Sequence, residues 1–578
     1  MNRRLLLVVV ALLATVAGVA GCATIPTSSE PEAVGTRDPG RRVRPPLAPE
    51  PGSDPLTLVR RYIEASGNPD GKHAAGRAYL TQNAQPNWRD DSSMHIIGND
   101  FSTFPAESED SRGDDKATVL VRGKWKGRLG RDNAFIPDSN DFEKRIRLEK
   151  EKGEWRIADP PDGVVTTIDR FDENYKPVPV YFLDRKRGEP VPDLRYIPSQ
   201  PRSAQPNAVI EMLLKGPSPA LKDAVRSAIP EGVRLRGNVV DAPDGALVVN
   251  LTDVGEQTSQ NVRLIATQVV LSLNSVSSLK VKLLSENVPI DKNKVDWRPS
   301  DFPQTTGDNV PPPNVPGMVV LGGRLRTLEK GGGPVKGPAG SLDVVTAAQS
   351  IDGGRLAVVT RSGSGQVALR VGPVEGNLTE VNLDPASHLT RPTWQPASND
   401  RGATELWTTV DHKSVVSVVY NTDREWTTRN VDATELTRNG SITDLRLSRD
   451  GVRVAAVVDS KLFVGSVVDN GNDVSIRNVR KLMDGVTAVD WQGPDNLIVG
   501  SDNAGQPVIK VSVDGLTVKP YTATNLSPPV TAVTAAPGRQ VVVADSRGLW
   551  VTADDSEYWR EHPANMMKQP NAVPFYPG

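Results

Sequence analysis

A repeat of about 44 residues constrains the C-terminal half of this chain more than any other sequence feature. Short segments that each contain a threonine recur at 345–347, 389–391, 442–444, 486–488 and 530–532, and the threonines are 44, 53, 44 and 44 residues apart. Turns such as Asp352-Gly353 and Asp450-Gly451 precede apolar runs of strand length. A period near 44 with about four short strands per unit is typical of a β-propeller. We therefore expect an all-β propeller over residues 317–578.

The number of blades can be bounded but not fixed. Five threonine repeats favour five blades, whereas the 262 residues from Gly317 onward leave six possible. Two strand-like segments, 318–321 and 324–328, precede the first repeat, and we expect strands from the front of the domain to complete the last blade, which would hide both sheet edges. Trp394 and Trp491 each lie four residues after a repeat threonine. We interpret them as core packing between blades rather than as a ligand platform.

The N-terminus carries the one candidate modification site. Arg3 and Arg4 precede an apolar run, Leu5 to Val19, and Cys22 is the only cysteine of the chain. This layout is typical of a secretory signal peptide, expected at residues 1–21. The run of about 15 residues is shorter than the roughly 20 that span a bilayer, which disfavours the alternative of a transmembrane helix with an incidental cysteine.

The segment Val19-Ala20-Gly21-Cys22 resembles a bacterial lipobox. The resemblance implies that Cys22 becomes an N-palmitoyl, S-diacylglycerol cysteine and the new N-terminus. Two acyl chains would anchor the protein stably. We expect the protein on the extracytoplasmic face of the cell membrane, with residues 22–53 as a lipidated, Pro-rich tether that reaches roughly 30 Å as a flexible coil. No disulfide is then possible, and no second apolar run long enough to cross the membrane follows.

A first folded domain is expected at residues 54–170. Asp54-Pro55 is a typical helix start, and Leu58, Val59, Tyr62 and Ile63 share one helical face. Another helical stretch surrounds 74–80, and strands are expected at 94–97, 117–125, 142–148 and 155–157, the last after a turn at 151–153. Helices followed by a curved antiparallel sheet resemble the α+β cone of the NTF2-like fold. His73, His95 and the acidic stretch 107–115 have no catalytic or metal-binding spacing, which favours surface histidines and a solvated loop.

A second domain is expected at residues 175–298. Its predicted order is strand, helix, strands, helix and strand, with strands at 178–183, 195–198, 246–251 and 279–283 and helices at 207–215 and 262–273. With the segments VYFL, LLKGP and VVNL, this α/β stretch resembles a GerMN domain, for which no chemistry is known. Residues 299–316 contain six prolines, and we interpret them as a semi-rigid linker.

The composition and motifs argue against several classes of function. Lysine and arginine number 68 against 70 acidic residues, a balance that disfavours nucleic-acid binding. The five histidines, His73, His95, His388, His412 and His562, show no paired metal-ligand spacing. Gly363-Ser364-Gly365 is expected in a hairpin rather than in a nucleophile elbow, and Gly331–Gly337 lacks the ending of a phosphate loop. We expect no catalytic residues, no cofactor and no metal, and hence no enzyme.

The complete order of lipobox, Pro-rich tether, NTF2-like unit, GerMN unit and propeller resembles the actinobacterial LpqB-type lipoproteins. The resemblance implies an accessory or modulator of a sensor histidine kinase of the MtrA–MtrB type, which engages the kinase's extracytoplasmic region and affects envelope homeostasis and division. No kinase-contacting residues can be carried over. Two alternatives remain, a propeller that binds or hydrolyses envelope glycan and a purely structural scaffold. The aromatic content of 5% weighs against the glycan alternative.

Overall fold

The structure is a computed structural model that describes residues 49–106, 114–302, 310–329, 331–397, 402–471, 473–564 and 571–578. These described residues belong to one compact unit. Cys22, the apolar run before it, the tether as far as residue 48 and most of the acidic stretch 107–115 lie outside them. Within the described ranges, no helix is both long and apolar enough to cross a membrane.

The first domain begins as its sequence predicts. Helix α2 (Pro55–Ser66) is capped by the Asp54 carboxylate, which accepts hydrogen bonds from the backbone N–H groups of Leu56 and Thr57 at 2.9 and 3.1 Å. The four predicted apolar residues of this helix are all buried. Helix α3 (Asp70–Arg77) has positive φ angles from Gly71 to His73, so its regular part starts at Ala74, near the predicted start.

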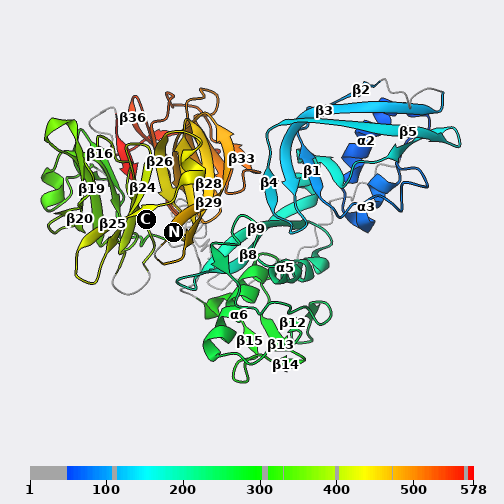
Figure 1. Cartoon of the computed structure of the whole chain (residues 1–578), viewed down its shortest axis with the longest axis horizontal. Helices are drawn as coiled ribbons and strands as arrows, with labels where there is room; N and C mark the ends of the chain where they lie inside the picture. The colour runs from blue at the N-terminus through cyan, green and yellow to red at the C-terminus, as the bar shows by residue number, and fades with distance from the viewer. Residues whose placement is uncertain are drawn as a thin grey trace, which may run out of the picture. The chain divides into compact units, whose positions relative to one another are not determined.

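Helix α2 packs against a seven-stranded sheet with the strand order β6-β5-β3-β1-β7 (Figure 1). Its strands are β1 (Met94–Ile97), β2 (Ser102–Pro105), β3 (Lys116–Leu129), β4 (Phe135–Pro137), β5 (Asp141–Glu151), β6 (Glu154–Asp159) and β7 (Val164–Thr167). Strand β3 pairs with β5 up to Lys124 and with β1 from Trp125 onward. Gly127 has a φ of 149°, and a Cβ there would collide with Ile136 O and the Phe135 ring. The long bent strand joins the two halves of the predicted α+β cone.

The second domain has two sheets around one hydrophobic core. Helix α4 (Ile168–Asn174) leads into β8 (Tyr175–Asp184), β9 (Pro190–Pro198), α5 (Gln205–Leu214) and β10 (Val225–Arg226). Then follow β11 (Val240–Asp241), β12 (Leu247–Leu251), α6 (Ser259–Asn274), β13 (Val281–Ser285), β14 (Val288–Pro289) and β15 (Asp296–Trp297). Strands β12 and β13 are parallel, as a crossover through α6 requires. The predicted α/β order is confirmed.

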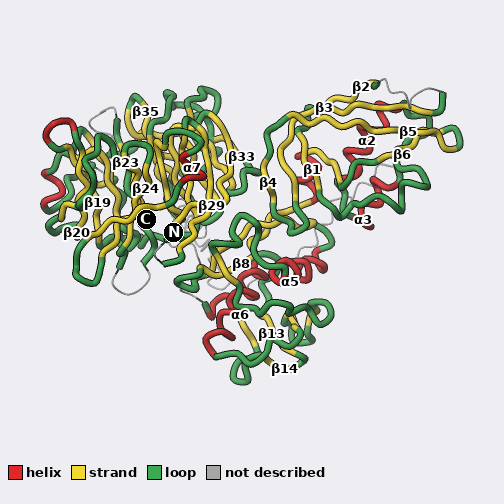
Figure 2. The backbone as a smooth tube through the Cα atoms, in the orientation of Figure 1, coloured by secondary structure: helices red, strands yellow, loops and turns green. Residues whose placement is uncertain are grey.

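The C-terminal region is a propeller, and almost all of its secondary structure is strand (Figure 2). It contains five four-stranded sheets. Their strands are β18 (Val344–Gln349), β19 (Arg355–Arg361), β20 (Val367–Pro373) and β21 (Thr379–Glu380); β22 (Thr393–Trp394), β23 (Glu405–Val410), β24 (Ser414–Tyr420) and β25 (Trp426–Val431); β26 (Ile442–Leu447), β27 (Arg453–Val458), β28 (Lys461–Asp469) and β29 (Val474–Asp484); β30 (Val486–Trp491), β31 (Asn496–Ser501), β32 (Val508–Ser512) and β33 (Val518–Pro520); and β34 (Ala532–Thr534), β35 (Val541–Asp545), β36 (Gly548–Thr552) and β37 (Arg560–Glu561). Each repeat threonine lies in or just before the first strand of one of these sheets. A short helix, α7 (Thr434–Thr437), precedes β26.

A sixth sheet closes the ring, so the propeller has six sheets rather than the five that the threonine count favours. It consists of β16 (Met318–Leu321), β17 (Arg324–Thr327) and β38 (Val573–Phe575), with β16 between the other two. The front strands do meet the C-terminal strand, as closure requires. They form a sheet of their own because β34 to β37 already supply four strands to the fifth repeat.

The loops singled out from the sequence have structural roles. The Gly363–Gly365 turn connects β19 and β20, which are a hairpin as predicted. Part of the predicted linker lies against the propeller, because Arg539 donates hydrogen bonds to the carbonyls of Pro312, Pro313 and Val315 at 2.8, 3.3 and 3.0 Å.

Candidate functional site

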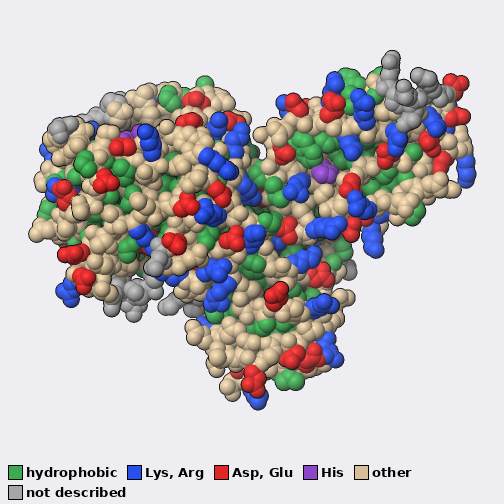
Figure 3. Space-filling view, in the orientation of Figure 1, with side chains coloured by type: hydrophobic (Ala, Val, Ile, Leu, Met, Phe, Trp, Pro, Cys, Tyr) green, Lys and Arg blue, Asp and Glu red, His purple; other side chains and the backbone are tan. Residues whose placement is uncertain are grey.

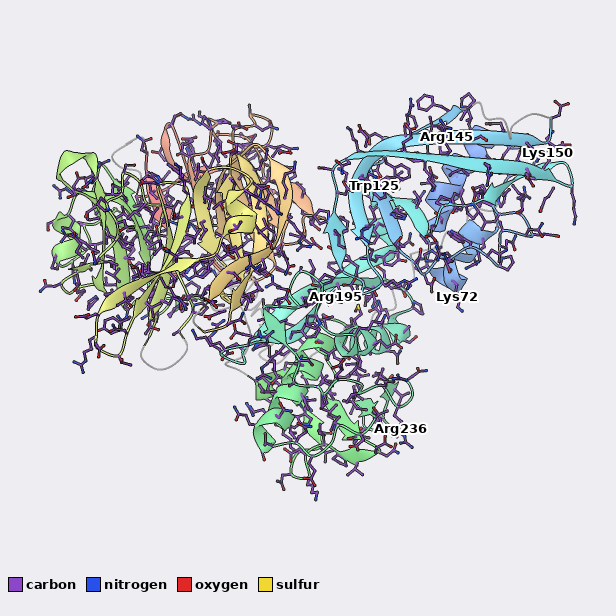
Figure 4. All side chains as sticks on the ribbon, viewed as in Figure 1. Lys72, Trp125, Arg145, Lys150, Arg195 and Arg236 are labelled. Carbon is purple, nitrogen blue, oxygen red and sulfur yellow. The ribbon has the colours of Figure 1, made fainter. Side chains whose placement is uncertain are left out.

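The two histidines of the first domain, His73 and His95, do not form a site together. His73 Nδ1 lies 2.7 Å from the carbonyl oxygen of Ser66, whereas His95 packs edge-on against Trp125, which Figure 4 labels on β3, with 5.1 Å between ring centroids. Both are half-buried rather than the surface histidines that we expect from the sequence, and burial lowers the pKa of each. Over the described ranges, no group of three or more His, Cys, Asp or Glu side chains could hold a metal ion.

The propeller brings His388 and His412 together. Their rings stack with centroids 4.0 Å apart and 21° between planes. Nδ1 of His412 lies 2.9 Å from the carbonyl oxygen of Ile442, and the Asp411 carboxylate accepts a hydrogen bond of 2.9 Å from the backbone N–H of His388. Imidazole lone pairs lie in the ring plane, so two stacked rings do not converge on one ion. Burial, and then the neighbouring His412, lower the pKa of His388.

Trp394 and Trp491 are core residues, as the sequence favours. Both are buried, and each indole N–H donates to a carbonyl on the first strand of the preceding sheet. The Trp394 bond to Ala348 O is 3.2 Å long, and the Trp491 bond to Arg446 O is 3.1 Å long. The equivalent positions therefore make an equivalent contact between neighbouring blades.

A buried charge network lies where the first strands of the propeller sheets meet. Asp490 pairs with Arg391 at 3.1 Å and accepts a hydrogen bond of 2.9 Å from Thr534. Burial alone would raise the pKa of Asp490, but Arg391, Arg446 and Arg449 hold it below its usual value. Burial lowers the pKa of Arg446 and Arg449 to about 10, so both remain cationic at neutral pH. The carboxylate is thus committed to neutralising guanidinium groups.

A second set of buried polar groups links the second domain to the propeller. Arg453 pairs with Asp450 at 2.8 Å and also donates to the carbonyl of Pro192. The Tyr196 hydroxyl donates a hydrogen bond of 2.8 Å to Asp514. Burial raises the pKa of Asp514 despite its hydrogen-bond donors. These residues were not predicted from the sequence, because nothing in their local sequence indicates a partner some 260 to 320 residues away.

An open groove with binding chemistry lies between the first two four-stranded sheets, and we call it the inter-blade groove. It has a volume of about 730 Å³ and is lined by residues at the end of β20 and the start of β25. Its lining residues come from the turns and strand ends at one end of both sheets, namely Asp352, Gly354, Arg355, Val371, Gly372, Pro373, Asn377, Thr379, Glu380, Asn382, Gly402, Tyr420, Arg424, Glu425 and Trp426.

An arginine backed by two aromatic rings lies in this groove. The Arg355 guanidinium carbon is 4.7 Å from the Tyr420 ring centroid and 5.5 Å from that of Trp426. The two rings are 4.9 Å apart, and Trp426 also packs edge-on against buried Trp394 at 6.1 Å. This site was not predicted from the sequence. The available signal was an aromatic residue on each side of the exposed turn Asn421–Glu425.

Comparison with known proteins gives consistent matches along the chain. Family models match residues 48–172 as "Lipoprotein LpqB, N-terminal domain", 179–291 as "Sporulation and spore germination" and 323–577 as "Lipoprotein LpqB beta-propeller domain". Proteins named "Lipoprotein LpqB" from Rhodococcus opacus (strain B4) and Nocardia farcinica (strain IFM 10152) are each 32% identical over 98% of this chain and 97% of their own length. One from Mycobacterium bovis (strain BCG / Pasteur 1173P2) is 29% identical over 100% of both chains.

Solved structures give a weaker match. A functionally unknown protein from Desulfotomaculum acetoxidans DSM 771 covers 46% of this chain and 100% of its own, at 8% identity and a TM-score of 0.30. A likeness at this level bears on neither fold nor function.

Proposed function

The chain belongs to the LpqB lipoprotein family, and from this premise we propose that it is an extracytoplasmic lipoprotein that modulates a sensor histidine kinase. In this proposal the acylated Cys22 holds the protein on the cell membrane. The three folded domains then lie outside the cytoplasm, where they bind the extracytoplasmic region of a kinase of the MtrA–MtrB type and act in envelope homeostasis and division.

The anchor can be tested separately from the partner. A Cys22→Ser variant removes the only thiol of the chain, so we expect it to leave the membrane fraction, and the wild-type N-terminus should have the mass of a diacylglyceryl and acyl adduct. An Ala23→Ser variant, changed beside the site, serves as the control and should stay membrane-bound. A wild-type protein that is soluble and unacylated would contradict the proposal.

The contacts of three buried carboxylates support a binding role rather than catalysis. Asp490 is held by arginines, Asp450 by Arg453, and Asp514 by the Tyr196 hydroxyl. A general acid or base needs access to the proton that it transfers, and these three groups are instead committed to packing within the fold. This is the observation that most favours a protein acting through its surface.

That surface is mixed in charge. On the face seen in Figure 3, Lys and Arg side chains are interspersed with Asp and Glu on every domain. Such a surface suits a specific protein partner better than a polyanion, whose binding would require a basic excess.

The decisive experiment reconstitutes the kinase in liposomes with and without the acylated protein. We expect the rate of autophosphorylation to change several-fold. Soluble Cys22→Ser protein at the same total concentration should have a smaller effect, because membrane anchoring raises the effective concentration at the kinase. Equal rates with and without the acylated protein would overturn the kinase partnership.

A further inference from the structure

We propose that the inter-blade groove binds a saccharide chain, with Arg355 as its central hydrogen-bond donor. The groove's volume of 730 Å³ falls within the range of about 300–1,000 Å³ of small-ligand sites. This proposal is independent of the kinase partnership, since it concerns a site that needs no second protein.

The Arg355 guanidinium is fixed in position, but its N–H donors are unsatisfied. Its guanidinium lies over Tyr420 and Trp426, and these rings are themselves fixed against Trp394. Within the part of the chain that the structure describes, no acceptor forms a hydrogen bond or ion pair with this guanidinium. An arginine has five N–H donors in one plane, and stacking on two rings fixes that plane. The groove thus contains a pre-oriented set of donors that is available to a ligand.

Hydrogen-bond acceptors, and groups that both donate and accept, surround these donors. Asp352 and Glu425 contribute carboxylates, and Asn377 and Asn382 contribute amides that both donate and accept. Arg424 adds a second guanidinium, whereas the carboxylate of Glu380 is already paired with Arg370 at 2.6 Å. An anionic ligand would meet the carboxylates and a cationic ligand the guanidiniums. A hydroxyl group both donates and accepts, so a neutral polyhydroxylated ligand matches the whole set.

The apolar part of the lining also fits a sugar better than a peptide. Two common modes of peptide recognition extend a free strand edge or bury apolar anchors in pockets. Here β21 has only two residues, and the exposed apolar lining consists of the two aromatic side chains and Pro373, since Val371 is fully buried. Tyr and Trp combine an apolar face with a polar group, which suits the C–H faces and hydroxyl groups of a sugar ring.

The test is titration of the full-length acylated protein in detergent micelles with two probes. One is a neutral arabinogalactan oligosaccharide, and the other is a carboxylated peptidoglycan glycan fragment without stem peptides. Calorimetry and tryptophan fluorescence should show saturable binding of the neutral probe and weaker binding of the carboxylated one. Arg355→Ala should weaken binding at least about tenfold, equivalent to about 1.4 kcal/mol.

Arg361→Ala is the matched control, because Arg361 is on the same strand, β19, and pairs with Asp343 at 2.9 Å outside the groove. It should leave the affinity unchanged. Asn382→Ala, at an exposed position, should also weaken binding and keeps the test valid if Arg355→Ala does not fold. No binding of the neutral probe at millimolar concentration, stronger binding of the carboxylated probe, or equal affinities of the Arg355, Asn382 and Arg361 variants would each overturn the proposal.

Discussion

At the scale of single residues, four partly or fully buried histidines couple the stability of this protein to pH. Burial lowers the pKa of His73, His95, His388 and His562 from the usual 6.5. The unfolded chain therefore binds protons at these positions at a higher pH than the folded chain does. By linkage, the stability that they contribute is complete above pH 6.5 and is lost as the pH falls through the lowered folded pKa values.

His388 gives the clearest single test. Replacing it with Gln removes one of the four protonation penalties, so the fall in melting temperature between pH 7.5 and 5.5 should be smaller than in the wild type. The slope should flatten only in part, because three other histidines contribute in the same direction. Thermal unfolding at the two pH values measures the difference, and an unchanged slope would show that burial does not hold His388 neutral.

At the scale of elements, the hydrogen bond from a buried indole N–H to the preceding blade is a contact that recurs in the propeller. Trp491→Phe removes the donor to Arg446 O and leaves space at a buried position, so we expect a loss of about 1–3 kcal/mol in unfolding free energy. Trp550→Phe is the matched control, since Trp550 is half-buried and its N–H has no partner among the described residues. Denaturant unfolding should show a larger loss of unfolding free energy for Trp491→Phe than for Trp550→Phe. Equal losses would mean that the indole bond contributes nothing beyond packing.

The sequence predicts these elements well where a local pattern carries the information. The repeat threonines locate the first strands, and the Asp54 cap locates the start of α2. Prediction from the sequence fails where segments that are far apart in the chain meet. The sixth sheet pairs Val319 with Pro574 and carries no repeat threonine, so the threonine spacing does not reveal it, although the length of the region leaves six blades possible. The inter-blade groove likewise requires Arg355 and Trp426, from two different repeats, to be side by side.

At the scale of the whole molecule, the second domain and the propeller behave as one unit because buried groups cross between them. Val452 of the propeller belongs to the hydrophobic core of the second domain. Arg453, which forms a pair with Asp450 in which both side chains are at most 5% exposed, donates to the carbonyl of Pro192 in the second domain. Removing one member of such a pair would leave an uncompensated buried charge. We therefore expect binding events on either domain to be transmitted as rigid-body displacements rather than absorbed at a flexible joint.

Tyr196 tests this coupling with little change in shape. Tyr196→Phe removes only the hydroxyl that donates to Asp514, so the buried carboxylate loses one donor, at an expected cost of about 1–3 kcal/mol. Hydrogen exchange should rise in the turn between β32 and β33, where Asp514 lies, while β12 and β13 stay protected. Tyr175→Phe is the control, because Tyr175 stacks on the same Phe171 at 4.9 Å and its hydroxyl has no protein partner among the described residues. If both variants change exchange in that turn equally, the Tyr196 hydroxyl does not couple the domains, and packing of the aromatic cluster alone accounts for the junction.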